Sequence, residues 1–398
     1  MTRAMADEVY YDPYDVEINA DPYPTFRRLR DEAPLYYNER HDFWALSRYE
    51  DCARVFLDNK TFISGRGGIL ELMKSGMELP PGIVLFEDPP THTMHRRLLS
   101  RMFTPKRVAS LEPNIREFCI ATLDALEGRE RFDFVKDLGA QVPMRVISML
   151  MGIPEEDQED VRDRVDDFLR TDPGQPMSYE TDHFAGEHFA KYLDWRMEHP
   201  TDDIMTELLH AEFEDDQGVV RTLSREELLV YINVVNGAGN ETTNRLIGWA
   251  GKVLADHPDQ RHELAENASL IPNAIEELLR LEPPAPHVGR WVAENVEFHG
   301  RTIPADSALL ILPGSANHDE RQFDEPECFD IHRQIGQILT FGYGIHFCLG
   351  AALARLEGRI VLEEVFKRFR DWEVDDEGAE LASTSTVRGW ESLPVVLA

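Results

Sequence analysis

The chain has 398 residues, with 41 Lys and Arg against 74 Asp and Glu, which gives a formal net charge of −33. This excess of acid excludes a general nucleic-acid-binding protein, which needs a basic face, and it disfavours docking on an anionic membrane. Hydrophobic residues make up 42% of the chain, a composition typical of a globular protein. No run approaches the roughly 18 apolar residues of a membrane helix. The N-terminal residues resemble no signal peptide, and the four cysteines are far apart. We therefore expect a cytoplasmic protein without a disulfide scaffold.

In the first part of the chain the pattern predicts few regular elements. Residues 1–20 are expected to form an extended N-terminal segment, and residues 44–46 a strand. Ser224 is followed three residues later by Glu227, the spacing of a capping box, so a helix is predicted to begin there.

The later part of the chain is more regular. Apolar residues at helical spacing predict helices over 271–281 and 353–369. Strands are expected over 296–298 and 309–312, and His299-Gly300 is expected to be the turn of a hairpin. Because no stretch has the composition of a linker, we expect one domain over residues 1–398, mainly α with a minor β-sheet region.

The sharpest feature is the run FGYGIHFCLG, residues 341–350, which leads directly into the last predicted helix. Cys348 stands in a glycine-rich loop at a helix N-terminus, where the helix dipole and free N–H groups stabilise a thiolate. An isolated cysteine is more often an inert buried side chain. The spacing Phe-x-x-Gly-x-His-x-Cys-x-Gly instead indicates a ligand, and zinc is disfavoured because no second Cys/His pair has ligand spacing.

This run resembles the haem-binding loop of the cytochrome P-450 family, the haem-thiolate monooxygenases, with Phe341, Gly344, His346, Cys348 and Gly350 at its fixed positions. The resemblance implies that Cys348 is the axial ligand of a haem b iron, and that its thiolate favours cleavage of the O–O bond. Phe341 would pack on the sulfur side of the haem. The implied fold is a triangular helical domain with the haem between two long helices.

The run AGNETT, which begins at Ala238, resembles the oxygen-activation segment of the same family. Ala238 and Thr242 are four residues apart and share a helix face, which would face the haem. The resemblance implies that Thr242 hydrogen-bonds dioxygen or a water beside it, and that Glu241 links this site to a proton route. Gly237 and Gly239 are expected to allow close approach to the haem and a local opening of the helix.

Basic side chains are implied to hold the haem propionates. His92 and Arg96 are four residues apart in a segment that resembles the family's third long helix, and by the same resemblance Arg290 and His346 would also contact a propionate. The other basic residues of the segment are expected on a solvated helix face: His95, Arg97 and Arg101.

Glu277 and Arg280 resemble the Glu-x-x-Arg pair of the family, a buried structural ion network behind the haem. Its third member is usually an Arg in a later segment, but here Cys328 stands where that Arg is common. We expect Arg333 to be the third partner.

The resemblance also implies an apolar substrate chamber on the haem face opposite Cys348, with walls from 62–86, 164–195 and the turn near Trp390. Its expected substrate-binding residues are Val84, Val234, Ala238 and Val288. Apolar walls favour a small lipophilic substrate such as a terpenoid, a steroid or a fatty compound.

We expect hydroxylation by a monomer that takes electrons from NAD(P)H through a ferredoxin reductase and a ferredoxin. The basic residues expected to attract an acidic ferredoxin are Arg96, Arg97, Arg101, Lys106, Arg107, Arg355 and Arg359. Two alternatives remain. One is a haem-thiolate peroxygenase or isomerase, which tends to lack the Glu-Thr pair. The other is a non-catalytic haem or lipid carrier, which does not need that pair.

Overall fold

Helices are the main regular elements in the computed structural model of this chain, which describes residues 8–179 and 182–397. The α-helices are α1 (Val16–Ala20), α2 (Tyr23–Glu32), α3 (Tyr49–Leu57), α4 (Leu70–Ser75), α5 (Thr91–Ser100), α6 (Pro105–Ser110), α7 (Glu112–Asp124), α8 (Val142–Met151), α9 (Gln158–Leu169), α10 (Asp182–Ala185), α11 (Ala190–Glu198), α12 (Ile204–His210), α13 (Arg225–Asp256), α14 (Pro258–Glu266), α15 (Ile271–Leu281), α16 (Pro313–Ala316) and α17 (Ala351–Arg368). Short 3-10 turns occur at η1 (Val84–Phe86), η3 (Glu155–Asp157), η4 (Glu187–Phe189), η5 (Ala268–Leu270) and η6 (Gly344–His346), and η2 (Phe134–Gly139) is a π-helix.

The strands are short and form small sheets. Their bounds are β1 (Leu35–Asn38), β2 (Phe43–Leu46), β3 (Phe62–Ile63), β4 (Arg131–Asp133), β5 (Phe213–Glu214), β6 (Val220–Arg221), β7 (Val288–Val292), β8 (Val296–Phe298), β9 (Arg301–Ile303), β10 (Ser307–Ile311), β11 (Trp372–Val374), β12 (Glu380–Leu381), β13 (Trp390–Ser392) and β14 (Pro394–Leu397). The largest sheet has the order β1-β2-β10-β7-β3, in which only β2 and β10 run parallel.

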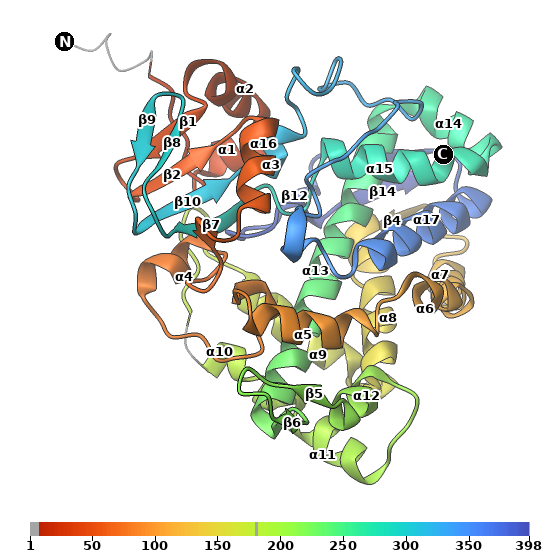
Figure 1. Ribbon diagram of the computed structural model, residues 1–398. Coiled ribbons are helices and arrows are strands. Elements are labelled where there is room, and N and C mark those ends of the chain that lie inside the picture. The colour runs from red at the N-terminus through yellow and green to blue at the C-terminus, as the bar shows by residue number, and fades with distance from the viewer. Residues whose placement is uncertain (1–7, 180–181, 398) are drawn as a thin grey trace.

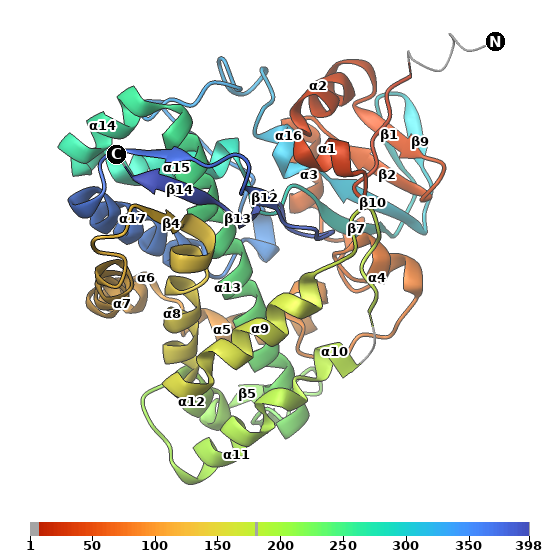
Figure 2. The ribbon, with the colours of Figure 1, turned by 180° about the vertical axis from the view of Figure 1, so that it is seen from behind.

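The outline of the molecule is triangular (Figure 1). One corner holds the five-stranded sheet with α2, α3 and α16, another holds α14 and α17, and the third holds α11 with β5 and β6. The long helix α13 runs through the middle, as the view from behind also shows (Figure 2). Within the described ranges no helix is both long enough and apolar enough to cross a membrane.

Local sequence signals account for where several elements begin and end. The capping box at the start of α13 is present, since Glu227 N donates to Ser224 Oγ at 3.1 Å and Ser224 N donates to Glu227 Oε2 at 2.7 Å. His299 and Gly300 have φ angles of 52° and 71°, the pair of positive values that a two-residue hairpin turn requires. The predicted helix over 271–281 and the strand over 296–298 are also confirmed.

The expected extended segment over 1–20 is wrong in its last part. Residues 1–7 lie outside the described ranges, but Val16–Ala20 form α1. The helix begins there because Asp15 Oδ1 accepts hydrogen bonds from the N–H groups of Glu17 and Ile18 and so caps the first turn.

Candidate functional site

The cysteine loop is a closed turn that leads into α17. Cys348 N donates to Phe341 O at 2.8 Å, and Phe347 N donates to Gly344 O at 3.1 Å. Gly344 has a φ of 74°, and a Cβ there would lie 2.7 Å from the backbone oxygen of Phe56. Only glycine fits this position, because any side chain would strain the backbone and push against α3.

The Cys348 thiol lies in a recess. It is accessible from outside, yet enough protein surrounds it that burial raises its pKa. The N–H groups of Gly350 and Ala351, together with Arg96 and Arg355, act in the opposite direction and favour the thiolate. A Cβ at Gly350 would meet no atom within 4 Å beyond its chain neighbours, so this glycine is not required by close packing within the described residues.

The structure brings together the four basic residues expected at the propionates. The rings of His92 and His346 have their centroids 4.2 Å apart. Arg96 donates to the backbone oxygen of Phe347. Arg290, His92 and Arg96 are all close enough to His346 to act on its charge, and with burial as the largest cause its pKa falls to about 3.

This basic cluster has the properties of an anion site. Arg290 is 5% exposed and forms no ion pair with a carboxylate of the described residues, and burial lowers its pKa to about 10. Both ring nitrogens of His92 are buried without a hydrogen-bond partner among those residues. Uncompensated buried cations and orphaned donors are costly in a folded protein. A group that carries two carboxylates fits them, as haem does with its propionates.

One face of α13 is open beside otherwise buried neighbours. Ala238 is exposed and Thr242 is half-buried, whereas Asn240, Glu241 and Thr243 between and after them are buried. Thr242 Oγ1 donates to the Ala238 oxygen at 3.0 Å. The two side chains therefore share a face on which the hydroxyl is available to a bound molecule.

The expected opening of α13 at its glycines is wrong. The helix is α-helical from Arg225 to Asp256 without interruption. Gly239 does not face the haem side: a Cβ there would lie 2.7 Å from Ile147 Cδ1, so this glycine allows close packing of α13 against α8.

Glu241 lies in a buried ion pair that the motif did not predict. Its Oε1 accepts from Arg245, and both side chains are 3% exposed. Arg245 also donates to the backbone oxygen of Trp390, and its Nη2 lies 3.4 Å from Glu391 Oε2. The sequence could have predicted this pair, because Glu241 and Arg245 are four residues apart on a helix and carry opposite charges.

The Glu277–Arg280 pair is fully buried, with Nε to Oε2 at 2.7 Å and Nη2 to Oε1 at 2.8 Å. Arg333 Nε donates to Glu277 Oε1 at 2.9 Å, so it occupies the third position expected for it. Arg280 contacts Cys328 through the backbone oxygen of that residue and not through its side chain, with Nη2 at 3.3 Å. The network therefore does not depend on which side chain stands at Cys328.

The comparisons with known proteins agree with this geometry. The cytochrome P-450 family model matches residues 180–390. A putative cytochrome P-450 of Mycobacterium tuberculosis is 37% identical over 402 residues, which cover 99% of both chains. The chain belongs to the cytochrome P-450 family. It is therefore a monooxygenase whose cofactor is haem b.

Other members of the cytochrome P-450 family are similar over nearly their whole length. The vitamin D(3) 25-hydroxylase of Pseudonocardia autotrophica is 34% identical over 383 residues, 95% of this chain and 94% of that protein. The solved cytochrome P-450 of Chondromyces apiculatus superposes with a TM-score of 0.85 at 33% identity and covers 98% of each chain. That of Bacillus megaterium, solved in complex with testosterone, has a TM-score of 0.85 at 28% identity and covers 96% of this chain and 98% of its own. The predicted fold class, mainly α with a minor sheet, is confirmed.

The expected substrate-binding residues come from three separate elements. Val84 of η1 is buried, and Val234 of α13 and Val288 of β7 are half-buried. Val234 lies one turn before Ala238 on the open face of α13. Of the wall expected over 164–195, residues 180–181 lie outside the described ranges.

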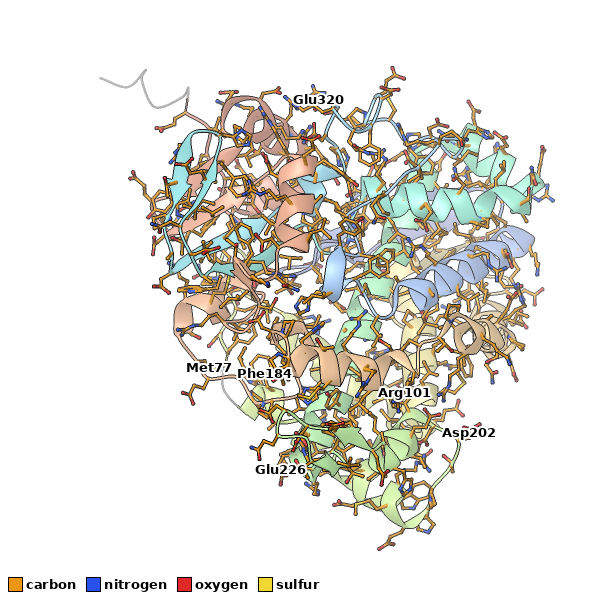
Figure 3. The ribbon with its side chains drawn as sticks, viewed as in Figure 1. Met77, Arg101, Phe184, Asp202, Glu226 and Glu320 are labelled. Atoms are coloured by element: carbon orange, nitrogen blue, oxygen red, sulfur yellow. The ribbon has the colours of Figure 1, made fainter. Side chains whose placement is uncertain are left out.

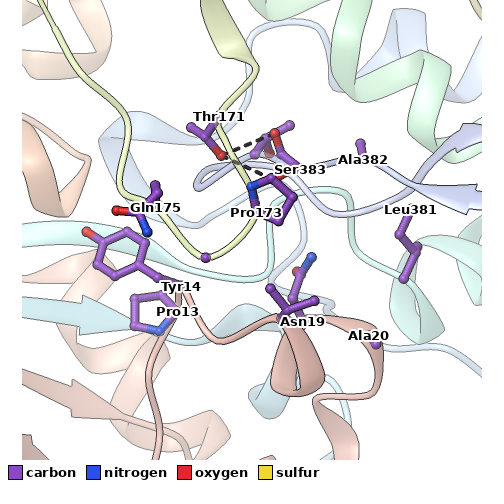
Figure 4. Close-up of a pocket in the computed structure, with 13 residues that line it drawn as sticks. Pro13, Tyr14, Asn19, Ala20, Thr171, Pro173, Gln175, Leu381, Ala382 and Ser383 are labelled. Carbon is purple, nitrogen blue, oxygen red and sulfur yellow. Dashed lines mark hydrogen bonds between the residues drawn. The ribbon is translucent and has the colours of Figure 1, made fainter.

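A surface cavity of about 140 Å³ lies elsewhere, between the N-terminal segment and the segments around Thr171 and Ser383 (Figure 4). Thr171 N donates to the Ser383 oxygen at 2.8 Å beside it. None of the candidate cofactor or catalytic residues lines this cavity, so we do not assign the reaction to it.

The expectation for His95 is wrong. It is 2% exposed, and its Nδ1 lies 2.8 Å from both carboxylate oxygens of Glu87. The expected ferredoxin patch is also smaller than predicted, because three of its members are paired with carboxylates. Those pairs are Arg107–Glu207, Arg355–Glu276 and Arg359–Glu112.

Proposed function

We propose that this cytochrome P-450 is a ferredoxin-dependent hydroxylase of a lipophilic substrate, with Cys348 as the ligand of the haem iron. The observation that carries the proposal is the basic cluster of His92, Arg96, Arg290 and His346 beside the recess of Cys348, in which His92 and Arg290 are buried. This cluster supplies donors for both propionates, and the thiol at the start of α17 supplies one iron ligand. The chain is proposed to act as a single cytoplasmic domain over 1–398, as a monomer.

The residues of the chain would hold the cofactor from several sides. Arg96 and His92 on α5, Arg290 on β7 and His346 in the cysteine loop would bind the propionates. Phe341, whose ring lies 4.4 Å from the Arg355 guanidinium carbon, would pack on the sulfur side. The small side chain of Ala238, which is exposed on α13, would leave room for the haem. When bound, the haem iron activates dioxygen.

Thr242 and Glu241 are proposed to supply protons at the distal side. The Thr242 hydroxyl can accept a hydrogen bond from a bound molecule and hold a water that donates. Glu241 shares Arg245 with Glu391, whose side chain is 27% exposed. A guanidinium stays protonated, so Arg245 would hold Glu241 in place and would not relay a proton itself. The second carboxylate oxygen of Glu241, which has no partner among the described residues, would exchange protons with a water beside Thr242.

The substrate is proposed to be a rigid lipophilic compound of the steroid or terpenoid class. The expected wall residues Val84, Val234 and Val288 are aliphatic, and they would exclude water from the reacting carbon. The names of two relatives, the vitamin D(3) 25-hydroxylase and the protein solved with testosterone, support the same class.

Electron transfer is proposed to use the outer face of α5. Arg97 on α5, Arg101 directly after it and Lys106 on α6 are exposed and form no ion pair with other described residues. Arg96 of the same helix touches the cysteine loop, so a ferredoxin on this face would be close to the haem. Arg101 stands at the end of α5 (Figure 3).

The decisive experiment is NAD(P)H consumption by the haem-loaded protein with a surrogate ferredoxin and its reductase, in the presence of a steroid. A hydroxylase consumes NAD(P)H and forms product. A peroxygenase forms product with hydrogen peroxide and no NAD(P)H. An isomerase needs neither NAD(P)H nor hydrogen peroxide, and a carrier shows no turnover under either condition.

A further inference from the structure

A buried acid–base pair lies next to the expected substrate chamber and has no part in the roles described so far. Glu87 follows η1, and His95 lies on the inner face of α5; both side chains are less than a tenth exposed. The His95 ring packs edge-on against Tyr231 of α13, with centroids 5.4 Å apart, and against Phe213 of β5 at 6.1 Å. The pair is therefore fixed between three elements.

Glu87 also ties the segment before it into a closed loop. Its Oε1 accepts from the backbone N–H of Gly82 at 2.7 Å, in addition to His95. Gly82 has a φ of 106°, and a Cβ there would lie 3.2 Å from Val230 Cγ1 of α13. The Glu87 carboxylate thus connects the two ends of segment 82–86 to each other, since Glu87 directly follows the segment and Gly82 begins it. Through His95 it also connects the segment to α5.

Segment 82–86 touches both walls of the expected chamber. On one side Ile83 packs in a cluster with Val230, and Val234 lies against the same cluster. On the other side the Phe86 ring lies 2.9 Å from where a Cβ of Gly68 would stand. The oxygen of Gly68 accepts from Gly289 N at 2.7 Å, next to Val288 of β7.

The same cluster also contains Leu72 and Phe184, which are buried, and Met77, which is partly buried. Met77 and Phe184 are seen near each other in Figure 3. The segment therefore lies between α13 and the Gly68–Gly289 contact at β7, the elements that carry the expected substrate-binding residues Val234 and Val288.

We propose that Glu87 and His95 are positioning residues that hold segment 82–86 in place and so determine which ligands fit above the haem. A buried hydrogen-bonded pair with a third hydrogen bond has one favourable arrangement, whereas the aliphatic contacts of Ile83 and Val84 alone allow sliding. The inference rests on the proposed function only in taking the haem site to lie below this segment.

The test compares two azoles that bind haem iron through nitrogen, in the haem-loaded full chain. Imidazole is small enough to leave segment 82–86 untouched, whereas phenylimidazole extends into the chamber. In Glu87→Ala we expect the Kd of phenylimidazole, measured by the Soret shift, to rise about tenfold, because the binding-competent loop position becomes a minor state. The Kd of imidazole and the haem content are expected to stay unchanged.

Two further variants keep the result interpretable. Glu87→Gln retains an oxygen for the Gly82 N–H and is expected to recover part of the phenylimidazole affinity. Asp203→Ala removes another buried carboxylate, which lies 2.7 Å from Arg196 on the distant α11–α12 corner, and should cost stability without changing either Kd. Equal changes for both azoles in Glu87→Ala, or no change in either, would overturn the inference. Failure of both azoles to shift the Soret band of the unaltered protein would overturn the proposed function itself.

Discussion

At Cys348, backbone N–H groups and the charges of Arg96 and Arg355 both stabilise the thiolate form of the sulfur. The N–H groups of Gly350 and Ala351 favour the thiolate against the cost of burial. We predict that the reduced, CO-bound protein has the long-wavelength Soret band of thiolate-ligated haem, and that Cys348→His loses this band while it can still retain haem. An imidazole-type spectrum of the unaltered protein, measured by absorbance, would remove Cys348 from the site.

Thr242 presents the only hydroxyl of the AGNETT run that is not buried, since Thr243 is 4% exposed. Thr242→Ala keeps the helix, because alanine is the best helix former, but removes the hydroxyl that orders protons. We expect NAD(P)H consumption at a near-native rate with hydrogen peroxide released in place of product. Thr243→Ala, about 100° further round the helix, is the control and should stay coupled. Full coupling in Thr242→Ala would refute its assigned role.

Glu357 on α17 is 2% exposed, its Oε2 has no partner among the described residues, and burial raises its pKa to about 8. The folded state therefore holds a proton that the unfolded chain releases above about pH 4. Stability should fall as pH rises from about 4 to 8, by up to about 1.4 kcal/mol per pH unit.

Urea unfolding of the haem-loaded protein at pH 5.5 and pH 8 tests this prediction. Glu357→Gln should remove most of the pH dependence and be more stable than the native chain at pH 8. Glu364→Gln on the same helix is the matched control: Glu364 lies 2.6 Å from Arg116, so its loss should destabilise the protein at both pH values. An unchanged slope in Glu357→Gln would show that this carboxyl is ionised in the folded protein.

At the scale of elements, α13 is positioned by glycines that allow neighbours to come close. At Gly239 an added Cβ would meet the flexible end of Ile147 at 2.7 Å, and at Gly251 it would meet the Phe134 ring at 2.6 Å. Substitution by alanine should therefore be tolerated at Gly239 and destabilising at Gly251, because the end of an Ile side chain can turn away and a packed ring cannot.

We predict that Gly239→Ala changes stability by less than about 1 kcal/mol, since the gain in helix propensity offsets a small rearrangement of Ile147. Gly251→Ala should lose about 1–3 kcal/mol by overpacking. Thermal unfolding of the two variants side by side measures the difference. Equal stabilities would mean that the Phe134 ring moves as freely as the Ile147 side chain.

At the scale of the whole molecule, the net charge of −33 makes a small cationic surface distinctive. We predict that reduction by an acidic ferredoxin slows as salt is raised, because exposed charges are screened over about 8 Å at physiological ionic strength. Arg101→Glu should slow reduction in stopped-flow measurements without changing azole affinity. Arg370→Glu, an exposed site at the far end of α17, makes the same change in net charge and should have no effect. If the two variants slowed reduction equally, the ferredoxin would respond to the net charge of the protein and not to a docking surface at Arg101.

Features that depend on neighbours in the chain were predictable. The capping box at Ser224, the hairpin at His299-Gly300 and the cysteine loop each depend on residues within about ten positions of one another, and each has the predicted local form. Arg333 could be chosen as the partner of Glu277 because the family pattern places an Arg in that segment.

The sequence by itself determined the family, the cysteine loop and the helix face that carries Ala238 and Thr242, since motif spacing and helical periodicity are properties of the chain. Only the tertiary structure decided which of these side chains have a partner within the protein. Glu241 is paired with Arg245 and His95 is buried against Glu87. Arg355 and Arg359 form ion pairs with Glu276 and Glu112. The tertiary structure also decided that Gly239 faces α8 and not the haem side. Periodicity states which residues share a face but not what covers it, because the covering element comes from a distant part of the chain and is selected by packing.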